Sequence, residues 1–221
     1  MKKIIKYFLI LLFTTLLPAQ EHDDKHQSNK HSFNNAERWA KIFENPERDE
    51  WQQPDLVIQS MEIKPNDIIV DIGSATGYFP MRFAEYVPNG KVIGVDVEKD
   101  MVDYLNHRAK KEGRQNLKSI LGEFHDPKIP LPVDIVFICN TYHHIENRVV
   151  YFKNIKRKIK PDGKLVIVDF RKGDLPVGPP DEHKLSPKQV IEELGKAGFI
   201  LTDHQKDLPY QYMLTFLLIG T

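Results

Sequence analysis

The feature that most constrains the fold of this chain is a regular alternation of two sequence patterns between residues 68 and 219. Short apolar runs rich in valine and isoleucine, which favour β-strands, alternate with segments whose apolar residues recur at helical spacing. Strands joined through helices pair in parallel, and the helices then cover both faces of the sheet. The seven predicted strands are Ile68–Ile72, Lys91–Asp96, Lys118–Leu121, Asp134–Asn140, Lys164–Asp169, Ile200–Gln205 and Gln211–Ile219.

The last two predicted strands depart from this parallel arrangement. Only Lys206 to Tyr210 separate them, too few residues for a crossover helix, so they are expected to form an antiparallel hairpin. The helix before the hairpin has clear boundaries, because Ser186 and Gln189 make a capping box and Gly198 ends it. The predicted fold class is α/β, a doubly wound, seven-stranded, mainly parallel sheet with an antiparallel last strand.

The composition excludes some classes of function. The 221 residues suffice for one compact domain plus a short appendage. The 31 lysine and arginine residues balance 31 aspartate and glutamate residues, so no net charge attracts the chain to nucleic acid, and we predict no nucleic-acid partner. The single cysteine, Cys139, excludes an internal disulfide bond and a multi-cysteine zinc site, and it is expected to be buried.

The N-terminal residues are typical of a secretory signal. Three lysines precede an apolar stretch from Tyr7 to Leu17, which is short for a membrane span and is followed by a candidate cleavage site after Ala19. The next segment is polar and lacks apolar periodicity, so we interpret its three histidines as part of a linker and not as metal ligands.

These features define the predicted domain organisation and location. Residues 1–19 are a signal peptide or an N-terminal anchor, residues 20–33 are a polar linker, and residues 34–221 form the folded domain, which begins with a helical lid. The expected location is exported or periplasmic, with membrane-anchored and cytoplasmic locations as alternatives. Membrane association is expected only through the N-terminal segment.

A loop of small residues after the first strand indicates a ligand site. Gly73 and Gly77 enclose three small residues, and a helix begins near Tyr78. Glycine lets a backbone approach a ligand closely, and the N–H groups at the start of a helix suit a carboxylate or phosphate.

The spacing of this loop separates two ligand classes. Dinucleotide-binding loops follow G-x-G-x-x-G, whereas Gly73-x-Ala75-x-Gly77 is one residue tighter and is preceded by Asp71. This spacing favours S-adenosylmethionine. Asp96 ends the second strand, where a carboxylate can bind both hydroxyls of a ribose in either class of ligand, so Asp96 does not decide between them.

The segment from Asp71 to Gly77 resembles the first motif of the class I S-adenosylmethionine-dependent methyltransferases, usually D-x-G-x-G-x-G. Ala75 replaces the middle glycine, a departure expected to be mild because alanine adds one methyl group. The resemblance extends from about Lys64 to the C-terminus, and further similar segments are Gly94-Val95-Asp96, Gly122-Glu123-Phe124 and Lys160-Pro161-Asp162-Gly163.

The resemblance implies a Rossmann-like methyltransferase fold with S-adenosyl-L-methionine as cofactor. It also implies a role for each matching residue. The methionine part would contact Asp71, Gly73, Ala75 and Gly77, the ribose would bind Asp96, the adenine would lie against Val97, Met101, Glu123 and Phe124, and Asn140 would lie beside the reactive sulfur.

The segment after the fourth strand bears on the acceptor. Thr141 to Ile145 is similar to small-molecule methyltransferases, including those of quinone biosynthesis, and lacks the N-P-P-Y or D-P-P-Y segment of nucleic-acid amino-methyltransferases. The resemblance thus implies a small-molecule acceptor, and an activated sulfonium needs no metal. A hydroxyl or enol acceptor would benefit from a general base. The predicted catalytic residues are His143, His144 and Tyr142, and Trp51, Asp169, His183 and Tyr210 are further candidates for the acceptor pocket.

Two other functions stay open at this point. One is a nicotinamide-dependent oxidoreductase, although the tight glycine loop and the antiparallel terminal hairpin count against it. The other is a non-catalytic cofactor-binding domain, because one fold supports many functions.

Overall fold

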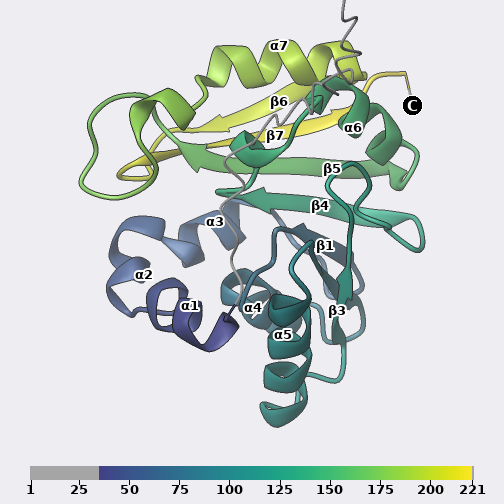
Figure 1. The fold of residues 1–221 in the computed structure, drawn as a ribbon. Helices are drawn as coiled ribbons and strands as arrows, with labels where there is room; N and C mark the ends of the chain where they lie inside the picture. Colours follow the sequence, from purple (N-terminus) through teal and green to yellow (C-terminus); the bar gives the residue numbers. More distant parts are fainter. Residues whose placement is uncertain (1–34, 221) are drawn as a thin grey trace, which may run out of the picture. The chain divides into compact units, whose positions relative to one another are not determined.

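The computed structural model describes residues 35–220, so the predicted leader and linker lie outside the described residues and stay predictions. One sheet contains seven strands in the order β3-β2-β1-β4-β5-β7-β6 (Figure 1). Only β7 runs against the others, since it pairs antiparallel with both β5 and β6. The predicted fold class is confirmed. The strands are β1 Ile68–Ile72, β2 Lys91–Asp96, β3 Leu117–Leu121, β4 Val133–Cys139, β5 Ile159–Phe170, β6 Phe199–Gln205 and β7 Gln211–Leu218.

Helices cover both faces of the sheet and also precede it. The α-helices are α1 Ala36–Phe43, α2 Glu47–Gln52, α3 Pro54–Ser60, α4 Tyr78–Tyr86, α5 Lys99–Lys111, α6 Arg148–Lys156 and α7 Pro187–Ala197, and two short 3₁₀ turns are η1 Tyr142–His144 and η2 Asp181–His183. Within residues 35–220, no helix combines the length and apolarity that a membrane span requires.

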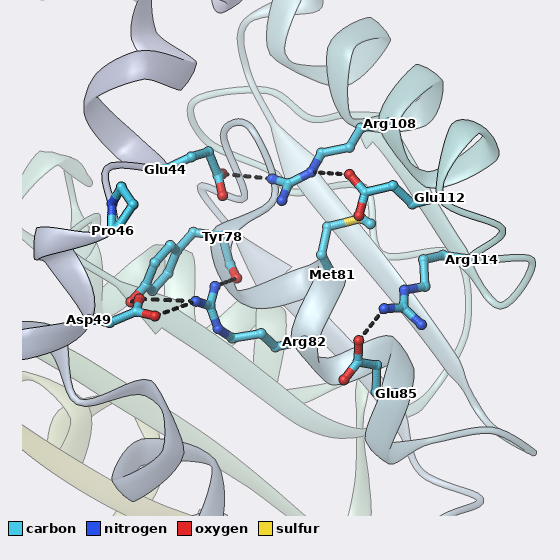
Figure 2. Close-up of a pocket in the computed structure, with 10 residues that line it drawn as sticks. All are labelled: Glu44, Pro46, Asp49, Tyr78, Met81, Arg82, Glu85, Arg108, Glu112 and Arg114. Atoms are coloured by element: carbon cyan, nitrogen blue, oxygen red, sulfur yellow. Dashed lines mark hydrogen bonds and ion pairs between the residues drawn. The ribbon is translucent and has the colours of Figure 1, made fainter.

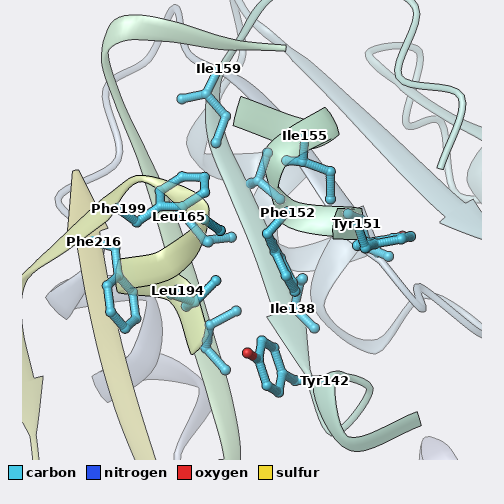
Figure 3. Packing of buried hydrophobic residues seen from close by; sticks show 14 of the residues in the cluster. Ile138, Tyr142, Tyr151, Phe152, Ile155, Ile159, Leu165, Leu194, Phe199 and Phe216 are labelled. Carbon is cyan, nitrogen blue, oxygen red and sulfur yellow. The ribbon is translucent and has the colours of Figure 1, made fainter. Parts of the chain in front are cut away.

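Two apolar clusters, one on each face, hold the sheet between its helices. On one face, α3, α4 and α5 pack against the strands through residues such as Phe83 and Leu105. On the other face, α6 and α7 pack through Phe152, Ile155 and Leu194, which surround Leu165 and neighbouring strand residues (Figure 3). The central strands are therefore buried on both sides, as their continuous apolar sequences require.

The start of β5 differs most from its predicted position, and the other predicted strand ends agree within one residue. β5 begins at Ile159, before the predicted start at Lys164, and α6 ends at Lys156. Pro161 explains the difference, because proline disfavours helical backbone at the residue before it. Ile159 pairs instead with Val133, and a register shift in β4 separates this contact from the rest of the ladder.

The predicted ends of α7 are present, but only half of the predicted capping box is, because the Gln189 side chain donates to Glu193. The Ser186 side chain accepts a hydrogen bond from the Gln189 N–H at 3.2 Å. Gly198 ends α7 in the left-handed region, at φ 94°. Helix α7, with these ends, packs against β6 and contributes Leu194 to the apolar cluster that also contains Phe152 and Ile155.

Leu105 allows a direct test of the packing against the loop between β1 and α4, from Gly73 to Gly77, which is called the ligand loop below. It is fully buried in α5, and a Cβ added at Gly77 or Gly94 would lie 2.3 or 2.8 Å from its methyl groups. Leu105→Ala should therefore leave a cavity and lower the free energy of unfolding by about 2–5 kcal/mol in urea denaturation. Lys110→Ala, at an exposed position of the same helix, should change it by no more than about 0.5 kcal/mol. Equal effects of the two substitutions would contradict this account.

Candidate functional site

The loop between β1 and α4 folds back over the end of β2. The N–H groups of Gly73 and Ser74 both donate to the carbonyl oxygen of Val95, at 2.8 and 3.1 Å. Gly73 has φ +79°, and a Cβ there would lie 2.1 Å from Oγ1 of Thr141. Glycine is therefore required at this position both for its backbone conformation and for the close approach of the segment after β4.

Ala75 and Asp96 are joined at the centre of this edge. The Ala75 N–H donates to Oδ2 of Asp96 at 2.9 Å, and the Glu98 N–H donates to Oδ1 at 3.0 Å. Ala75 adopts φ 44°, so the alanine in place of glycine adds backbone strain of about 1 kcal/mol as well as a methyl group. Burial raises the pKa of Asp96, and the two backbone N–H groups partly offset that effect.

Exposed apolar side chains surround the ends of β2 and β3. Val97, Leu121 and Phe124 are 37%, 51% and 57% exposed, whereas Met101 is buried beneath them in α5. Glu123, next to Phe124, is exposed and forms an ion pair with Lys128 at 3.2 Å. Large exposed apolar groups beside a carboxylate that ends a strand fit the flank of a flat, partly apolar ligand.

Asp71 is almost completely buried at the end of β1. Burial raises the pKa of its carboxyl to about 8, the nearby Asp96 raises it further, and the positive charge of Arg48 partly opposes both effects. Such a group is mainly neutral at pH 7, so it can act as a hydrogen-bond donor or release a proton when a cation binds beside it.

Helices α1 and α2 are fastened to the loop by two groups of charged residues, drawn in Figure 2. In the first, Glu44 forms an ion pair with Arg108 at 2.8 Å (Figure 2). Glu44 also accepts a hydrogen bond from the Thr76 hydroxyl at 2.7 Å. In the second, Asp49 accepts a hydrogen bond from the Tyr78 hydroxyl at 2.5 Å and pairs with Arg82 at 2.9 Å. The helices thus lie over the start of α4, and that they act as a lid stays a prediction.

A pocket of about 350 Å³ lies at this contact between the lid and helices α4 and α5 (Figure 2). Its lining includes Glu85, Arg114 and Glu112 as well as the charged groups just described, and ion pairs connect most of them. Neither Asp71 nor Asp96 lines it. The pocket is therefore separate from the residues predicted to bind the cofactor.

Three amide side chains close a ring on the inner side of the lid. Gln52 donates to Gln211 at 2.5 Å, Gln211 donates to Asn140, and Asn140 donates to Gln52 at 3.4 Å. Gln52 and Gln211 are fully buried. The ring joins α2, the loop after β4 and the start of β7. It therefore connects the lid to the loop that contains Asn140.

His143, in η1 after β4, and Asp169, near the end of β5, form a buried pair. Nδ1 of His143 lies 2.9 and 3.0 Å from the two carboxylate oxygens, and the side chains are 3% and 0% exposed. Asp169 Oδ1 also accepts the Phe170 N–H at 2.8 Å. A carboxylate at Nδ1 favours the tautomer protonated there, which leaves Nε2 as the proton acceptor. The exposed His144 ring packs against His143, with centroids 4.2 Å apart.

The structure places Tyr142 in the core and not at the predicted site. Its ring stacks on Phe152 with centroids 5.2 Å apart, and its hydroxyl donates to Glu193 at 2.9 Å, beside Arg148. The 3₁₀ turn η1 directs this side chain toward α6 and α7. The predicted catalytic role of Tyr142 therefore has no support from the geometry.

The remaining predicted residues are spread around this edge. The ring centroid of Trp51, in the lid, lies 5.7 Å from that of Phe170, the residue that follows Asp169 in the sequence. His183 is exposed in η2, and the carbonyl of Tyr210 accepts the Arg171 N–H at 3.0 Å. The cofactor residues stay predictions, but the structure does bring the loop and Asp96 into direct contact.

Arg48, Gln52 and Gln211 are site residues that the sequence did not single out. Arg48 and Gln52 lie in the short helix α2, which is rich in charged residues and has no apolar periodicity. Such a segment is usually solvent-exposed. Their inward orientation depends on contacts with residues far away in the sequence, such as Gln211, so no local signal marked them.

The strand order, the reversed β7 and the loop beside Asp96 define the class I methyltransferase architecture, and sequence comparison agrees. A methyltransferase-domain family matches residues 63–212. The chain therefore belongs to the class I S-adenosylmethionine-dependent methyltransferases, a family of enzymes, and the predicted resemblance is confirmed.

Individual relatives support this assignment. The chain is 30% identical over 124 residues to an uncharacterized methyltransferase of Schizosaccharomyces pombe, covering 51% of this chain and 44% of that protein. It is 28% identical over 134 residues to a demethylmenaquinone methyltransferase of Lactococcus lactis, covering 58% and 51%. The chain thus spans about half the length of these curated relatives. The structure of a SAM-dependent methyltransferase from Aquifex aeolicus matches with a TM-score of 0.77 and 27% identity, covering 84% of this chain and 99% of that one.

The raised pKa of Asp71 predicts how stability depends on pH. Because the folded-state pKa of about 8 lies above the usual 3.8, the folded protein holds a proton that the unfolded chain releases, so stability is lost as pH rises through this window. Asp71→Asn cannot ionise and should be more stable than the parent protein at pH 8, by on the order of 1–2 kcal/mol or about 2–8 °C in Tm.

Thermal unfolding followed by circular dichroism from pH 5 to pH 8 tests this prediction. The difference in Tm between Asp71→Asn and the parent should grow with pH. Asp103→Asn, at a 62% exposed side chain, should show no such trend. A difference that is constant or shrinks with pH would mean that Asp71 is ionised in the folded protein.

Proposed function

We propose that this protein transfers the methyl group of S-adenosylmethionine to a small-molecule acceptor. The observation that carries the proposal is the contact at one edge of the sheet between the small-residue loop and Asp96, with Val97, Leu121 and Phe124 exposed beside it. A polar anchor next to exposed apolar groups suits a nucleoside, and family membership identifies which nucleoside to expect.

The residues present fit this cofactor. Each carboxylate oxygen of Asp96 accepts one backbone N–H, and each has a second lone pair that can accept a ribose hydroxyl. Val97 and Phe124 would flank the adenine. The backbone around Gly73 and Gly77 would contact the methionine part, where the first N–H groups of α4 provide a positive end.

The chemistry requires alignment and, for a protic acceptor, a base. When bound, the cofactor supplies a sulfonium whose methyl group is attacked as the carbon–sulfur bond breaks and its electron pair stays on sulfur. The lid would exclude water from this step. His143, oriented by Asp169, would take the proton from the acceptor at Nε2, and His144 would contribute to the entrance of the acceptor pocket.

Two observations support a small-molecule acceptor. The balanced net charge provides no field for nucleic acid. The Lactococcus relative is named for methylation of a quinone precursor. The nicotinamide-dependent oxidoreductase loses support because the matched family and relatives are methyltransferases. The experiments below distinguish a catalytic protein from a non-catalytic cofactor-binding domain.

Isothermal titration calorimetry tests the cofactor. The purified protein should bind S-adenosylmethionine with a Kd on the order of 1–100 µM, and Asp96→Ala should weaken binding at least about 10-fold, because the ribose hydroxyls lose a charged acceptor. Asp103→Ala, on the outer face of α5, should bind as the parent does. Preferential binding of NADH, or binding of neither ligand, would overturn the proposal.

The role of His143 is tested by turnover and by its tautomer. With a panel of phenols and quinols, and S-adenosylhomocysteine as the measured product, His143→Gln should lower kcat by about 10²–10⁴-fold and leave S-adenosylmethionine affinity unchanged. In ¹⁵N NMR, Asp169→Asn should reduce the fraction of His143 protonated at Nδ1, while exposed His107 is unaffected. Full turnover by His143→Gln would exclude it as the base, and cofactor binding without turnover of any acceptor would favour the non-catalytic alternative.

A further inference from the structure

Arg48 reaches from the lid to the start of α4 and is held there in a defined orientation. Its Nη1 donates to the carbonyl oxygen of Phe43 at 2.9 Å, and its Nη2 donates to Oε1 of Gln52 at 3.2 Å. The guanidinium carbon lies 3.7 Å from the ring centroid of Tyr78, the residue that follows Gly77. Two hydrogen bonds and a stacked ring therefore fix the guanidinium plane beside the ligand loop.

One donor of this guanidinium is unsatisfied. The Nε of Arg48 is buried and has no hydrogen-bond partner among the described residues. A buried donor without an acceptor costs about 1–3 kcal/mol, and more when the group is charged. Native structures satisfy most such groups, so an exception of this kind calls for an explanation.

The acidic residues of the lid do not supply the missing partner. Glu44 is paired with Arg108, and Asp49 is paired with Arg82. Within residues 35–220, Arg48 forms no ion pair with an aspartate or glutamate side chain. The buried Asp71 feels the positive charge of Arg48, yet its pKa stays near 8, so at neutral pH it is mainly uncharged. Arg48 thus has no carboxylate within ion-pair distance among the described residues.

The position of Arg48 indicates which part of a ligand it would meet. The Gln52 oxygen that accepts its hydrogen bond also accepts from Cys139 and Asn140, at 3.6 and 3.4 Å, so the guanidinium lies near the carboxyl end of β4. Asp96 and the exposed apolar side chains lie at the ends of β2 and β3, on the nucleoside side of the loop. Arg48 is therefore placed at the opposite end of the ligand from the adenine.

We propose that Arg48 binds the carboxylate of the amino-acid part of the cofactor, through Nε and the neighbouring Nη. This inference rests on the proposed function. A carboxylate matches the planar fork of a guanidinium in two parallel hydrogen bonds, which satisfies Nε and neutralises the charge in one contact. The mainly neutral Asp71 lies beside the same end, where it can give up its proton to pair with the ammonium group. Arg48 is then a binding residue that the lid itself contributes.

Ligand truncation combined with substitution tests the assignment. S-adenosylhomocysteine carries the carboxylate, and its decarboxylated analogue keeps the amine and lacks only that group. In calorimetry, Arg48→Met should weaken S-adenosylhomocysteine binding by about 10- to 100-fold, the loss expected for hydrogen bonds between charged groups. The same variant should bind the decarboxylated analogue within about twofold of the parent, and Arg48→Lys should fall between parent and Arg48→Met for S-adenosylhomocysteine.

Arg82→Met is the matched control, because Arg82 lies over the same Tyr78 ring at 4.1 Å but is paired with Asp49. It should not discriminate between the two ligands. Equal weakening of both ligands by Arg48→Met would assign Arg48 to lid structure, and no weakening would remove it from the site; either result overturns the inference and leaves the proposed function standing. If the parent protein binds neither ligand, the proposed function fails, and this inference fails with it.

Discussion

The pairing of β1 between β2 and β4 is the constraint on which the rest of the structure depends. Both pairings are parallel, so the three strands end at the same edge of the sheet. Apolar side chains cover both faces, and a slip of one residue would exchange the faces of every side chain in a strand, which fixes the register. Packing of the core therefore decides where the ligand loop, Asp96 and the His143–Asp169 pair lie, although these residues contribute little to that packing themselves.

Sequence patterns predicted the features that local physics controls. Apolar runs with short connections specified the strands, and the residues around α7 specified its ends. The site was only partly predictable. Asp96 and Gly73 lie at strand ends, where a pattern can mark them, whereas the side-chain direction of Tyr142 depends on Glu193, which is distant in the sequence. Arg48 lies in a charged helix whose sequence is typical of a solvent-exposed segment. Its side chain points inward because it packs over the Tyr78 ring and donates a hydrogen bond to Gln52.

The site combines several features that oppose folding. Ala75 adopts a left-handed backbone, Asp71 holds a carboxyl group away from water, and Arg48 buries a donor without a partner. Each costs stability, and each orients a group toward the same edge. The two apolar clusters offset these costs, a distribution common at functional sites, where strain persists only because the surrounding structure enforces it.

The ring formed by Gln52, Gln211 and Asn140 has a consequence for the order of events during synthesis. The lid helices leave the ribosome early, and the loop after β1 follows, but the amide that fastens α2 on its inner side comes from β7, the last strand of the sheet. Until β7 has been made and inserted between β5 and β6, Gln52 has Arg48 and Asn140 as partners but lacks Gln211, and the ring stays open. A nascent chain would thus carry the loop after β1 under helices held only by Glu44 and Asp49, and the inner side of the lid would be among the last parts of the molecule to close.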